Sequence, residues 1–357
     1  MNLNASSDVT DGDAALHQPN TPPWRAAVER VQERLAHLRA RADGTLMTEI
    51  SGPHFVVITK EGSEIRLWLM EQGRPSTGVV QSEIDLAAPI DLIEGYTQAM
   101  TLLLLWNPAP GRVFFSGLGG GRVPLVLHCL LPDLQICAAD IDPQIIRIAE
   151  SHFGLEIGNR ISVDLADGRQ WLEQRPALFD AIVVDVFLDN GYTPYRQATA
   201  EFYTLCRARL EPNGVLVINL LENDPYVARK LATLASIFTH VYTVAVDHEN
   251  IIVFATDSDA VHPDRARSLA ERLNAHWQLP FPFVERAARL SGDHSRFAEN
   301  LESLEPFVDR QPPPGYFDAL PALTGPFGKT NATLPCPCGS GRAYGICHGR
   351  PGVPTRA

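Results

Sequence analysis

Between Gly111 and Thr256, short segments rich in apolar and β-branched residues alternate with longer segments whose apolar residues recur at helical spacing. Five strands are expected in this region, in RVFFSG, LQICAAD, RISVDLAD, DAIVVDV and GVLVINL. A helix between two strands returns the chain to the end of the sheet where it started, so these strands run parallel. Two last strands, HVYTVAV and IIVFAT, are separated by only four residues and are antiparallel. The alternation predicts a parallel sheet covered by helices on both faces, with a hairpin at its end.

Five parallel units followed by such a hairpin are typical of the class I methyltransferase fold, a Rossmann-like α/β sheet. A small antiparallel β unit is expected before it, over about residues 46–86, and an amphipathic helix in Trp24–Ala42. Residues 258–310 are expected to form helices that pack on the sheet. The predicted organisation has five parts: a disordered N-terminus in 1–22, a helix and small β domain in 23–90, a Rossmann-like catalytic domain in 91–310, a Pro-rich linker in 311–334 and a zinc-binding tail in 335–350.

Charge and hydropathy narrow the classes of partner. The formal net charge of −12 argues against non-specific binding to nucleic acid or to an anionic membrane. The polar, acidic N-terminal segment lacks the features of a signal peptide, and the apolar runs are too short to span a bilayer. A soluble cytoplasmic protein is therefore expected.

Four glycines, Gly117, Gly119, Gly120 and Gly121, crowd the turn after the first parallel strand. Ligands of open parallel sheets bind at the carboxyl ends of the strands, where glycine lets the backbone approach them. A plain tight turn is the alternative interpretation. The dinucleotide fingerprint requires a glycine where this chain has Arg122, so NAD and FAD are disfavoured. The loop fits a nucleoside ligand without a pyrophosphate, such as S-adenosylmethionine and its relatives.

Aspartates follow at the ends of three successive strands. Asp140 is placed to accept hydrogen bonds from ribose hydroxyls, whereas Asp142 is expected to cap the next helix. Asp167, with the backbone of Gly168 beside it, is placed to accept from an adenine amino group. Asp185 is expected to face the reactive end of the ligand. Aspartate is common at strand ends, so one such residue is weak evidence for a ligand site. Three of them at the ends of successive strands are stronger evidence.

These segments resemble the polyamine aminopropyltransferase (spermidine synthase) family over about residues 45–256. GVVQSEID is similar to the family's strand with a nucleoside-contacting glutamine, here Gln81, and EGYTQAMTLLL to its tyrosine-bearing helix, here Tyr96. AADID, ADG and VVDVF are similar to its ribose, adenine and catalytic motifs, which implies these roles for Asp140, Asp167 and Asp185. The resemblance implies transfer of an aminopropyl group from decarboxylated S-adenosylmethionine to a small amine, by a homodimer or larger assembly.

Two departures from the family bear on the reaction. The family's glycine loop carries an aspartate that binds the propylamine end of the donor, and the matching position here is Gly120. Without that carboxylate, we expect intact S-adenosylmethionine to bind at least as well as the decarboxylated donor. Arg122 either favours the carboxylate of the intact donor or faces solvent. The family's second substrate-binding carboxylate is altered, since DVFLDNGYTP has Asp189 one residue late.

The residues that bind the acceptor amine are less clearly indicated by the sequence. A tentative set of acceptor-binding residues lies on segments expected around it: Tyr96, Asp189, Tyr192, Asn219 and Glu222. Tyr192 and Tyr195 are expected either to cover the site or to anchor their loop. Asp224 is either a further contact or the cap of the helix in PYVARKL.

Three of the six cysteines, Cys336, Cys338 and Cys347, fall within twelve residues near the C-terminus, and His348 follows them. Three thiolates and an imidazole complete a tetrahedral zinc shell without an open position, as in structural sites. CPCGSGRAYGICH resembles the SEC-C zinc motif, which implies contacts with another protein. The other cysteines are expected in the core.

Two further readings stay open. A methyltransferase on the same scaffold is favoured by Gly120, whereas Gln81, the N-terminal β unit and Asp185 favour the aminopropyltransferase. A non-catalytic nucleotide-binding adaptor that acts through its zinc tail is the other. Substitution of Asp185 or of Cys336 separates the enzyme readings from the adaptor.

Overall fold

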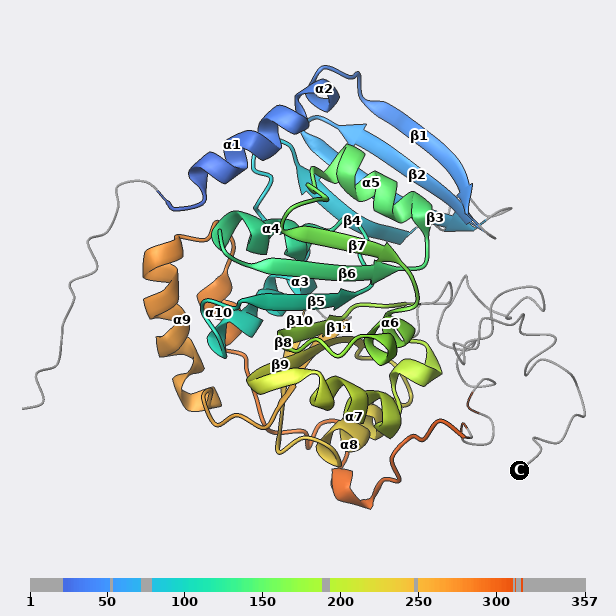
Figure 1. Ribbon diagram of the computed structural model, residues 1–357, viewed down its shortest axis with the longest axis vertical. Coiled ribbons are helices and arrows are strands. Elements are labelled where there is room, and N and C mark those ends of the chain that lie inside the picture. Colours follow the sequence, from blue (N-terminus) through green and yellow to red (C-terminus); the bar gives the residue numbers. More distant parts are fainter. Residues whose placement is uncertain are drawn as a thin grey trace, which may run out of the picture.

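The computed structural model contains two β-sheets (Figure 1). It describes residues 22–51, 54–71, 79–187, 193–246, 250–310, 312 and 316. The first sheet is antiparallel, in the order β1 (Gly44–Ser51), β2 (His54–Glu61), β3 (Glu64–Glu71) and β4 (Val79–Asp85). The second sheet has seven strands in the order β10-β11-β9-β8-β5-β6-β7. These strands are β5 (Arg112–Ser116), β6 (Gln135–Asp140), β7 (Ile161–Leu165), β8 (Phe179–Val184), β9 (Leu210–Leu221), β10 (His240–Val246) and β11 (Asn250–Thr256).

The seven-stranded sheet has the predicted direction of every strand. β5 to β9 pair in parallel, and β11 inserts antiparallel between β9 and β10. The predicted Rossmann-like sheet with a terminal hairpin is thus confirmed. The carboxyl ends of the parallel strands meet at one edge, which places the predicted ligand residues together.

One face of this sheet is covered by α6 (Gly168–Gln174), α7 (Ala200–Ala208) and α8 (Val227–Ala235) (Figure 1). Aromatic rings fill this layer, and Phe114 of β5 stacks on Trp171 of α6 with ring centroids 4.4 Å apart. Apolar residues at alternate positions of β5 and β8 point into the layer, as expected for strands buried on both faces.

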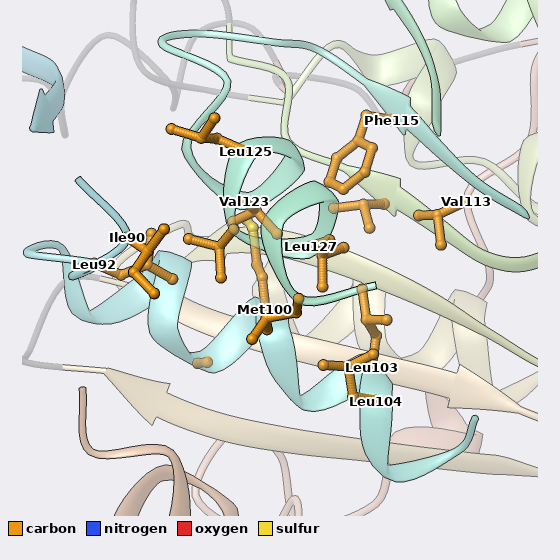
Figure 2. Close-up of a cluster of buried hydrophobic side chains, with 14 of the residues drawn as sticks. Ile90, Leu92, Met100, Leu103, Leu104, Val113, Phe115, Val123, Leu125 and Leu127 are labelled. Atoms are coloured by element: carbon orange, nitrogen blue, oxygen red, sulfur yellow. The ribbon is translucent and has the colours of Figure 1, made fainter. Parts of the chain in front are cut away.

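Among the described residues, the opposite face carries a second group of helices. They are α3 (Gly95–Met100), η2 (Thr101–Leu105), α4 (Arg122–Leu130), α5 (Pro143–Phe153), α9 (Pro263–Trp277) and α10 (Phe283–Ala287). Figure 2 shows Val123 and Leu127 of α4 between Phe115 of β5, at the top of the view, and Met100 and Leu103 below, and all five belong to one apolar cluster. Every one of these side chains is buried.

The N-terminal β unit shares this second core. Its sheet and the helices α1 (Arg25–Arg34) and α2 (Ala36–Arg39) contribute Val31, Ile58 and Ile84 to the cluster that also holds Leu102. The unit is therefore packed onto the larger sheet through continuous apolar contact. This contact fixes β4, with Gln81 and Ser82, against the glycine loop.

Two elements differ from the prediction. The helix expected in Trp24–Ala42 breaks at Leu35, whose backbone leaves the helical region and whose amide still bonds to Val31. The β unit predicted over about residues 46–86 was read from the runs HFVVITK, SEIRLWLM and TGVVQSEI, and β1 is an additional strand whose segment, GTLMTEIS, lacks a clean alternation of apolar and polar residues. In the part of the chain that the structure describes, no helix is long and apolar enough to cross a membrane.

The last described residues form a strap across the helical face that holds α7 and α8. We use the name C-terminal strap for residues 304–310 together with Tyr316, which follow η4 (Leu301–Ser303). Phe307 and Tyr316 are both 1% exposed, and their rings pack against Tyr195 and Tyr226. Tyr316 lies inside the expected linker of 311–334, so packing on the sheet domain extends into that range.

Candidate functional site

The predicted nucleoside residues converge at the carboxyl edge of the parallel strands. The amide of Gly117 donates to the Ala139 carbonyl of β6 at 2.9 Å, and the Asp185 amide donates to the Ser116 carbonyl of β5 at 2.9 Å. These bonds continue the sheet ladders beyond the strand ends. They bring the loops after β5, β6 and β8 side by side.

Glycine is required at Gly117 for both conformation and space. Its φ of +90° is in the region that side chains rarely adopt, and a Cβ there would collide with the carbonyl oxygen of Asp185. Gly121 also has positive φ, at +62°, where it begins α4. The loop after β5 is therefore a tight turn whose backbone lies directly against the residue predicted to be catalytic.

The position of the absent family aspartate, Gly120, is filled by neighbouring side chains. A Cβ on Gly120 would lie 2.7 Å from the Cβ of Ser82 and 2.8 Å from the Phe153 ring. The Gly120 amide donates to the Ser82 hydroxyl at 2.8 Å. In this chain, position 120 is closed by packing, and a larger residue there requires Ser82 and Phe153 to move.

Asp140 lies at the end of β6, where predicted, and holds the loop with both carboxylate oxygens. Oδ2 accepts from the Leu118 amide and Oδ1 from the Asp142 amide, each at 2.9 Å. Burial raises the pKa of Asp140, against the lowering effect of these bonds. Asp142 caps α5, as expected, by accepting from the Gln144 amide at 2.8 Å.

Sequence reasoning missed Ile141, which lies between these two aspartates. Its side chain is 70% exposed although it directly follows Asp140 at the carboxyl edge. An exposed branched side chain next to Asp140, the predicted ribose residue, could offer an apolar surface to the base of a nucleoside. The available signal was an isoleucine flanked by two acidic loop residues, in a place where solvation favours polar residues.

Asp167 and Gly168 open α6 next to the same edge. Asp167 accepts from the Gln170 amide at 2.9 Å and so serves as the helix cap. A Cβ on Gly168 would collide with the side chain of Ser116, so only glycine lets α6 begin this close to β5. Its backbone therefore lies beside the loop after β5.

Asp185 is the most perturbed carboxylate of the edge. Burial raises its pKa to about 6, although a hydrogen bond from Asn219 Nδ2 to Asp185 Oδ1, 3.0 Å long, works in the opposite direction. Asn219 is 2% exposed and accepts from Asn250 Nδ2 at 2.9 Å. Asn250 was not predicted, because its role depends on the pairing of β11 with β9.

Tyr96 approaches Asp185 from α3. Burial, with the charge of Asp185 as the next cause, raises the pKa of its phenol well above the usual value, so the phenol is neutral. Its hydroxyl donates to the Gln81 carbonyl of β4 at 3.3 Å. Tyr96 and Gln81 therefore meet at the same side of the carboxyl edge as Asp185.

Other candidates have partners that give them structural roles. Glu222 forms an ion pair with Arg296 at 3.2 Å. Asp224 accepts from the Tyr226 amide and from Lys230, but Tyr226 is the N-cap of α8 and no side chain caps that helix, so Asp224 is not the expected cap. Tyr195 is 1% exposed and donates to the Val308 carbonyl at 2.9 Å, so it anchors its loop.

Arg122 does not face solvent, which corrects one of the two alternatives expected for it. It is 5% exposed rather than solvent-facing, and its Nη2 donates to the carbonyls of Pro89 and Asp91 at 2.7 and 3.2 Å. Burial lowers its pKa to about 10. Arg122 ties the start of α4 to the segment that joins β4 and α3.

Several predicted residues lie outside the described part of the chain: Asp189, Tyr192, Cys336, Cys338, Cys347 and His348. Within the described residues, no three His, Cys, Asp or Glu side chains are arranged to hold a metal ion. Cys129 and Cys206 are buried in the core, as expected, and Cys137 is partly buried.

Comparisons with known proteins show similarity in two parts of the chain. A family model of the SEC-C motif matches residues 333–350. The polyamine aminopropyltransferase of Chromobacterium violaceum is 32% identical over 237 residues, which span 65% of this chain and 88% of that protein. The human eEF1A lysine and N-terminal methyltransferase is 30% identical over 209 residues, or 54% of this chain and 29% of that protein.

A solved structure shares the fold. A probable spermidine synthase from Corynebacterium glutamicum ATCC 13032 matches with a TM-score of 0.59 at 18% identity. The match covers 75% of this chain and 97% of that chain. The match therefore extends over almost the whole of that chain.

Proposed function

Because the chain belongs to the polyamine aminopropyltransferase family, we propose that it is a transferase that alkylates an amine from an adenosyl-sulfonium donor. The donor is S-adenosylmethionine or its decarboxylated form. The observation that carries this proposal is the half-buried carboxylate of Asp185, which lies at the carboxyl edge between the glycine loop, Tyr96 and Asn219.

The chemistry requires a neutral amine and a proton acceptor. The amine nitrogen attacks the carbon bound to the sulfonium, the carbon–sulfur bond breaks, and its electron pair leaves with the sulfur. The amine then loses a proton, which the Asp185 carboxylate accepts. A pKa of about 6 makes this carboxylate a stronger base than an ordinary aspartate while keeping it mostly ionised at neutral pH.

The nucleoside part of the donor fits the remaining edge residues. We assign the ribose to Asp140, the adenine edge to Asp167 and Gly168, and further nucleoside contact to Gln81 and the loop glycines. The exposed side chain of Ile141 supports this assignment, because a bound base covers it. Tyr96, Asn219, Asp189, Tyr192 and Glu222 remain the proposed acceptor side, with Glu222 neutralised by Arg296.

Packing at Gly120 supports binding of the intact donor. No carboxylate extends from that position toward the propylamine end, because the residue is glycine, and Ser82 and Phe153 occupy the space that a side chain would need. Calorimetry with both donors tests this part of the proposal, and we expect S-adenosylmethionine to bind at least as tightly as its decarboxylated form. A hundredfold preference for the decarboxylated form would exclude it.

A methyltransferase is the second candidate, favoured by Gly120 and by the 30% identity to the eEF1A methyltransferase. Mass spectrometry separates the two reactions, because the amine product gains either an aminopropyl or a methyl group. Putrescine is the first acceptor to test, with each donor in turn. A product with neither group from any amine would contradict both enzymatic readings.

We also propose that Cys336, Cys338, Cys347 and His348 hold one structural zinc ion within the SEC-C match. Three thiolates and an imidazole form a closed tetrahedral donor set, which supports a structural rather than a catalytic ion. The tail then serves as a docking module for another protein. If Cys336→Ser removes a measured phenotype that Asp185→Asn leaves intact, the adaptor reading replaces the enzymatic one.

A further inference from the structure

Two asparagines stand in line behind the carboxylate of Asp185. We propose that Asn250 is a positioning residue that fixes the amide of Asn219 and, through it, directs one oxygen of Asp185 at the acceptor amine. The inference rests on the role of Asp185 in the proposed function. It adds a residue from the antiparallel strand to a site otherwise built on the parallel strands.

The strand register places the three side chains on one face of the sheet. Val184 pairs with Ile218, so Asp185 and Asn219 follow at neighbouring positions of β8 and β9. Ile252 of β11 pairs with Asn219. Asn250 lies two residues before Ile252, and alternate residues of a strand share a face, so its side chain reaches Asn219 diagonally.

The direction of the hydrogen bonds is dictated by Asp185. An ionised carboxylate only accepts, so the amide of Asn219 must turn its NH₂ group toward Asp185. This orientation points Asn219 Oδ1 away from Asp185, and the atom needs a donor because Asn219 is 2% exposed. Asn250 supplies that donor at 2.9 Å, and Asn219 in turn donates to Asp185 Oδ1 at 3.0 Å.

The chain of bonds leaves one oxygen of Asp185 for chemistry. Oδ1 is occupied by Asn219, whereas Oδ2 accepts no hydrogen bond from the side chains that the structure describes. If Asn250 is lost, Asn219 Oδ1 is left buried without its donor, and only the carboxylate itself holds the amide of Asn219 in this orientation. Its rotation would place Oδ1 against the carboxylate, which weakens the ionised form of Asp185 by repulsion.

The groups that face Asp185 are few and mostly uncharged. α3 contributes the neutral phenol of Tyr96, behind which lie Glu94 and Arg122. β9 contributes the amide of Asn219, and the loop after β5 contributes the backbone of Gly117. Among the described neighbours, we therefore expect the hydrogen bonds of Asn219 and Asn250 to have the main effect on the ionisation of the Asp185 carboxylate.

The test follows the titration of the Asp185 carboxyl by carbon NMR in the ligand-free protein, with Asp185→Asn used to assign the signal. Asn250→Leu removes the donor at similar size, and we expect the midpoint of the titration to move upward by about one pH unit, a tenfold change in the ionisation constant. Asn250→Ala provides a second truncation if the leucine variant does not fold.

A double-variant cycle identifies the route. In the Asn219→Leu background, we expect Asn250→Leu to cause no further change in the titration midpoint, because the side chain that links Asn250 to Asp185 is already absent. Thr256→Val serves as the matched control, since it removes a buried hydrogen bond to the Gly214 carbonyl at the far end of β11. It should lower stability without moving the titration.

An unchanged titration in Asn250→Leu, or a shift that persists in the Asn219→Leu background, would overturn the inference. Because the titration is measured without substrate, it can contradict the role of Asn250 without bearing on whether the protein is a transferase. An upward shift together with absence of any transfer to amines would retain the positioning role of Asn250 and reject the transferase.

Discussion

At the residue scale, burial gives Asp185 its chemical character. A carboxylate with a pKa near 6 accepts a proton more readily than a surface aspartate and loses activity over a higher range of pH. The raised pKa does not come from a charged side chain in contact with the carboxylate, because the phenol of Tyr96 is neutral and Asn219 contributes an amide.

We expect Asp185→Asn to reduce the rate of transfer by about 10²- to 10⁴-fold, the range for loss of a general base. In the unsubstituted protein, activity should fall as pH decreases through about 6, where the carboxylate becomes protonated. Steady-state rates between pH 5 and 9 measure both effects. Asp133→Asn, at an exposed position, is the control and should leave the profile unchanged.

The raised pKa of Asp185 also makes the free energy of unfolding depend on pH. The pKa of Asp185 is higher in the folded chain than in the unfolded one, so its contribution to stability is greatest at low pH and is lost as pH rises through about 6. Asp185→Asn removes that loss. Relative to the unsubstituted protein, the variant should therefore gain stability between pH 5 and pH 8 in urea unfolding, and an opposite trend would contradict the assignment.

Close packing at Gly120 makes a second residue-scale prediction. We expect Gly120→Ala to cost about 1–3 kcal/mol in the free energy of unfolding, because the new Cβ overlaps Ser82 and Phe153. Urea denaturation measures the loss. Gly111→Ala is matched, since its Cβ would lie 3.7 Å from Asp180 at ordinary contact distance. Equal stability of the two variants would show that position 120 is open.

Residues that act through strand pairing escape prediction from sequence. Asp140, Asp167 and Asp185 were found because the ends of parallel strands can be read along the chain. Ser82 and Asn250 were not, because one reaches the glycine loop from the other sheet and the other reaches Asn219 through the β11–β9 register. Ser82 lies within GVVQSEID, but that motif pointed only to Gln81, and Asn250 lies in none of the quoted motifs.

At the element scale, the elements of the larger sheet were predictable because each strand is a short apolar run bounded by a helix with clear periodicity. Pro143 and Asp142 mark the start of α5, and Gly154 has positive φ directly after its end. The break at Leu35 was not predictable, since the apolar spacing continues across it. There, tertiary packing of Leu35 and Leu38 in the core overrides local helical preference.

Helix α8 is attached to the loop after β9 by a buried ion pair. Lys230 Nζ lies 2.5 Å from Asp224 Oδ2, and both side chains are almost fully buried. Removal of one partner leaves an uncompensated charge in the interior. The pair therefore fixes the helix relative to the strand that carries Asn219.

We expect Lys230→Met to lower the free energy of unfolding by about 3–5 kcal/mol. Arg267→Met, which breaks the exposed pair with Glu271, should cost at most about 0.5 kcal/mol. Chemical denaturation of both variants gives the comparison. The double variant Lys230→Met, Asp224→Asn should recover part of the loss, and similar small losses in both single variants would contradict the buried pairing.

At the scale of the whole molecule, the C-terminal strap connects the end of the described chain to the site. Asp309 binds Arg169 through both carboxylate oxygens at 2.7 and 2.5 Å, and accepts from Thr199 at 2.8 Å. Arg169 directly follows Gly168, so the strap supports the helix that begins beside the glycine loop. The strap belongs structurally to the sheet domain.

We expect deletion of residues 330–357 to preserve the melting temperature and nucleoside binding, because the strap remains. Deletion from residue 304 onward should lower both, since loss of a buried aromatic such as Phe307 alone costs about 3–5 kcal/mol. Differential scanning calorimetry and calorimetric titration with S-adenosylmethionine measure these effects. Loss of folding in the shorter deletion would contradict a separable tail.

The arrangement of strands in the two sheets distributes the candidate site over residues 81–250. Gln81, Gly117, Asp140, Asp185 and Asn250 come from five different strands or the loops that follow them. No partly folded fragment contains the whole set, so a ligand at this edge binds the native state almost exclusively. At a hundred times its dissociation constant it would add about 2.7 kcal/mol to global stability. Slower amide hydrogen exchange should therefore extend from β4 to β11 rather than remain local to the glycine loop.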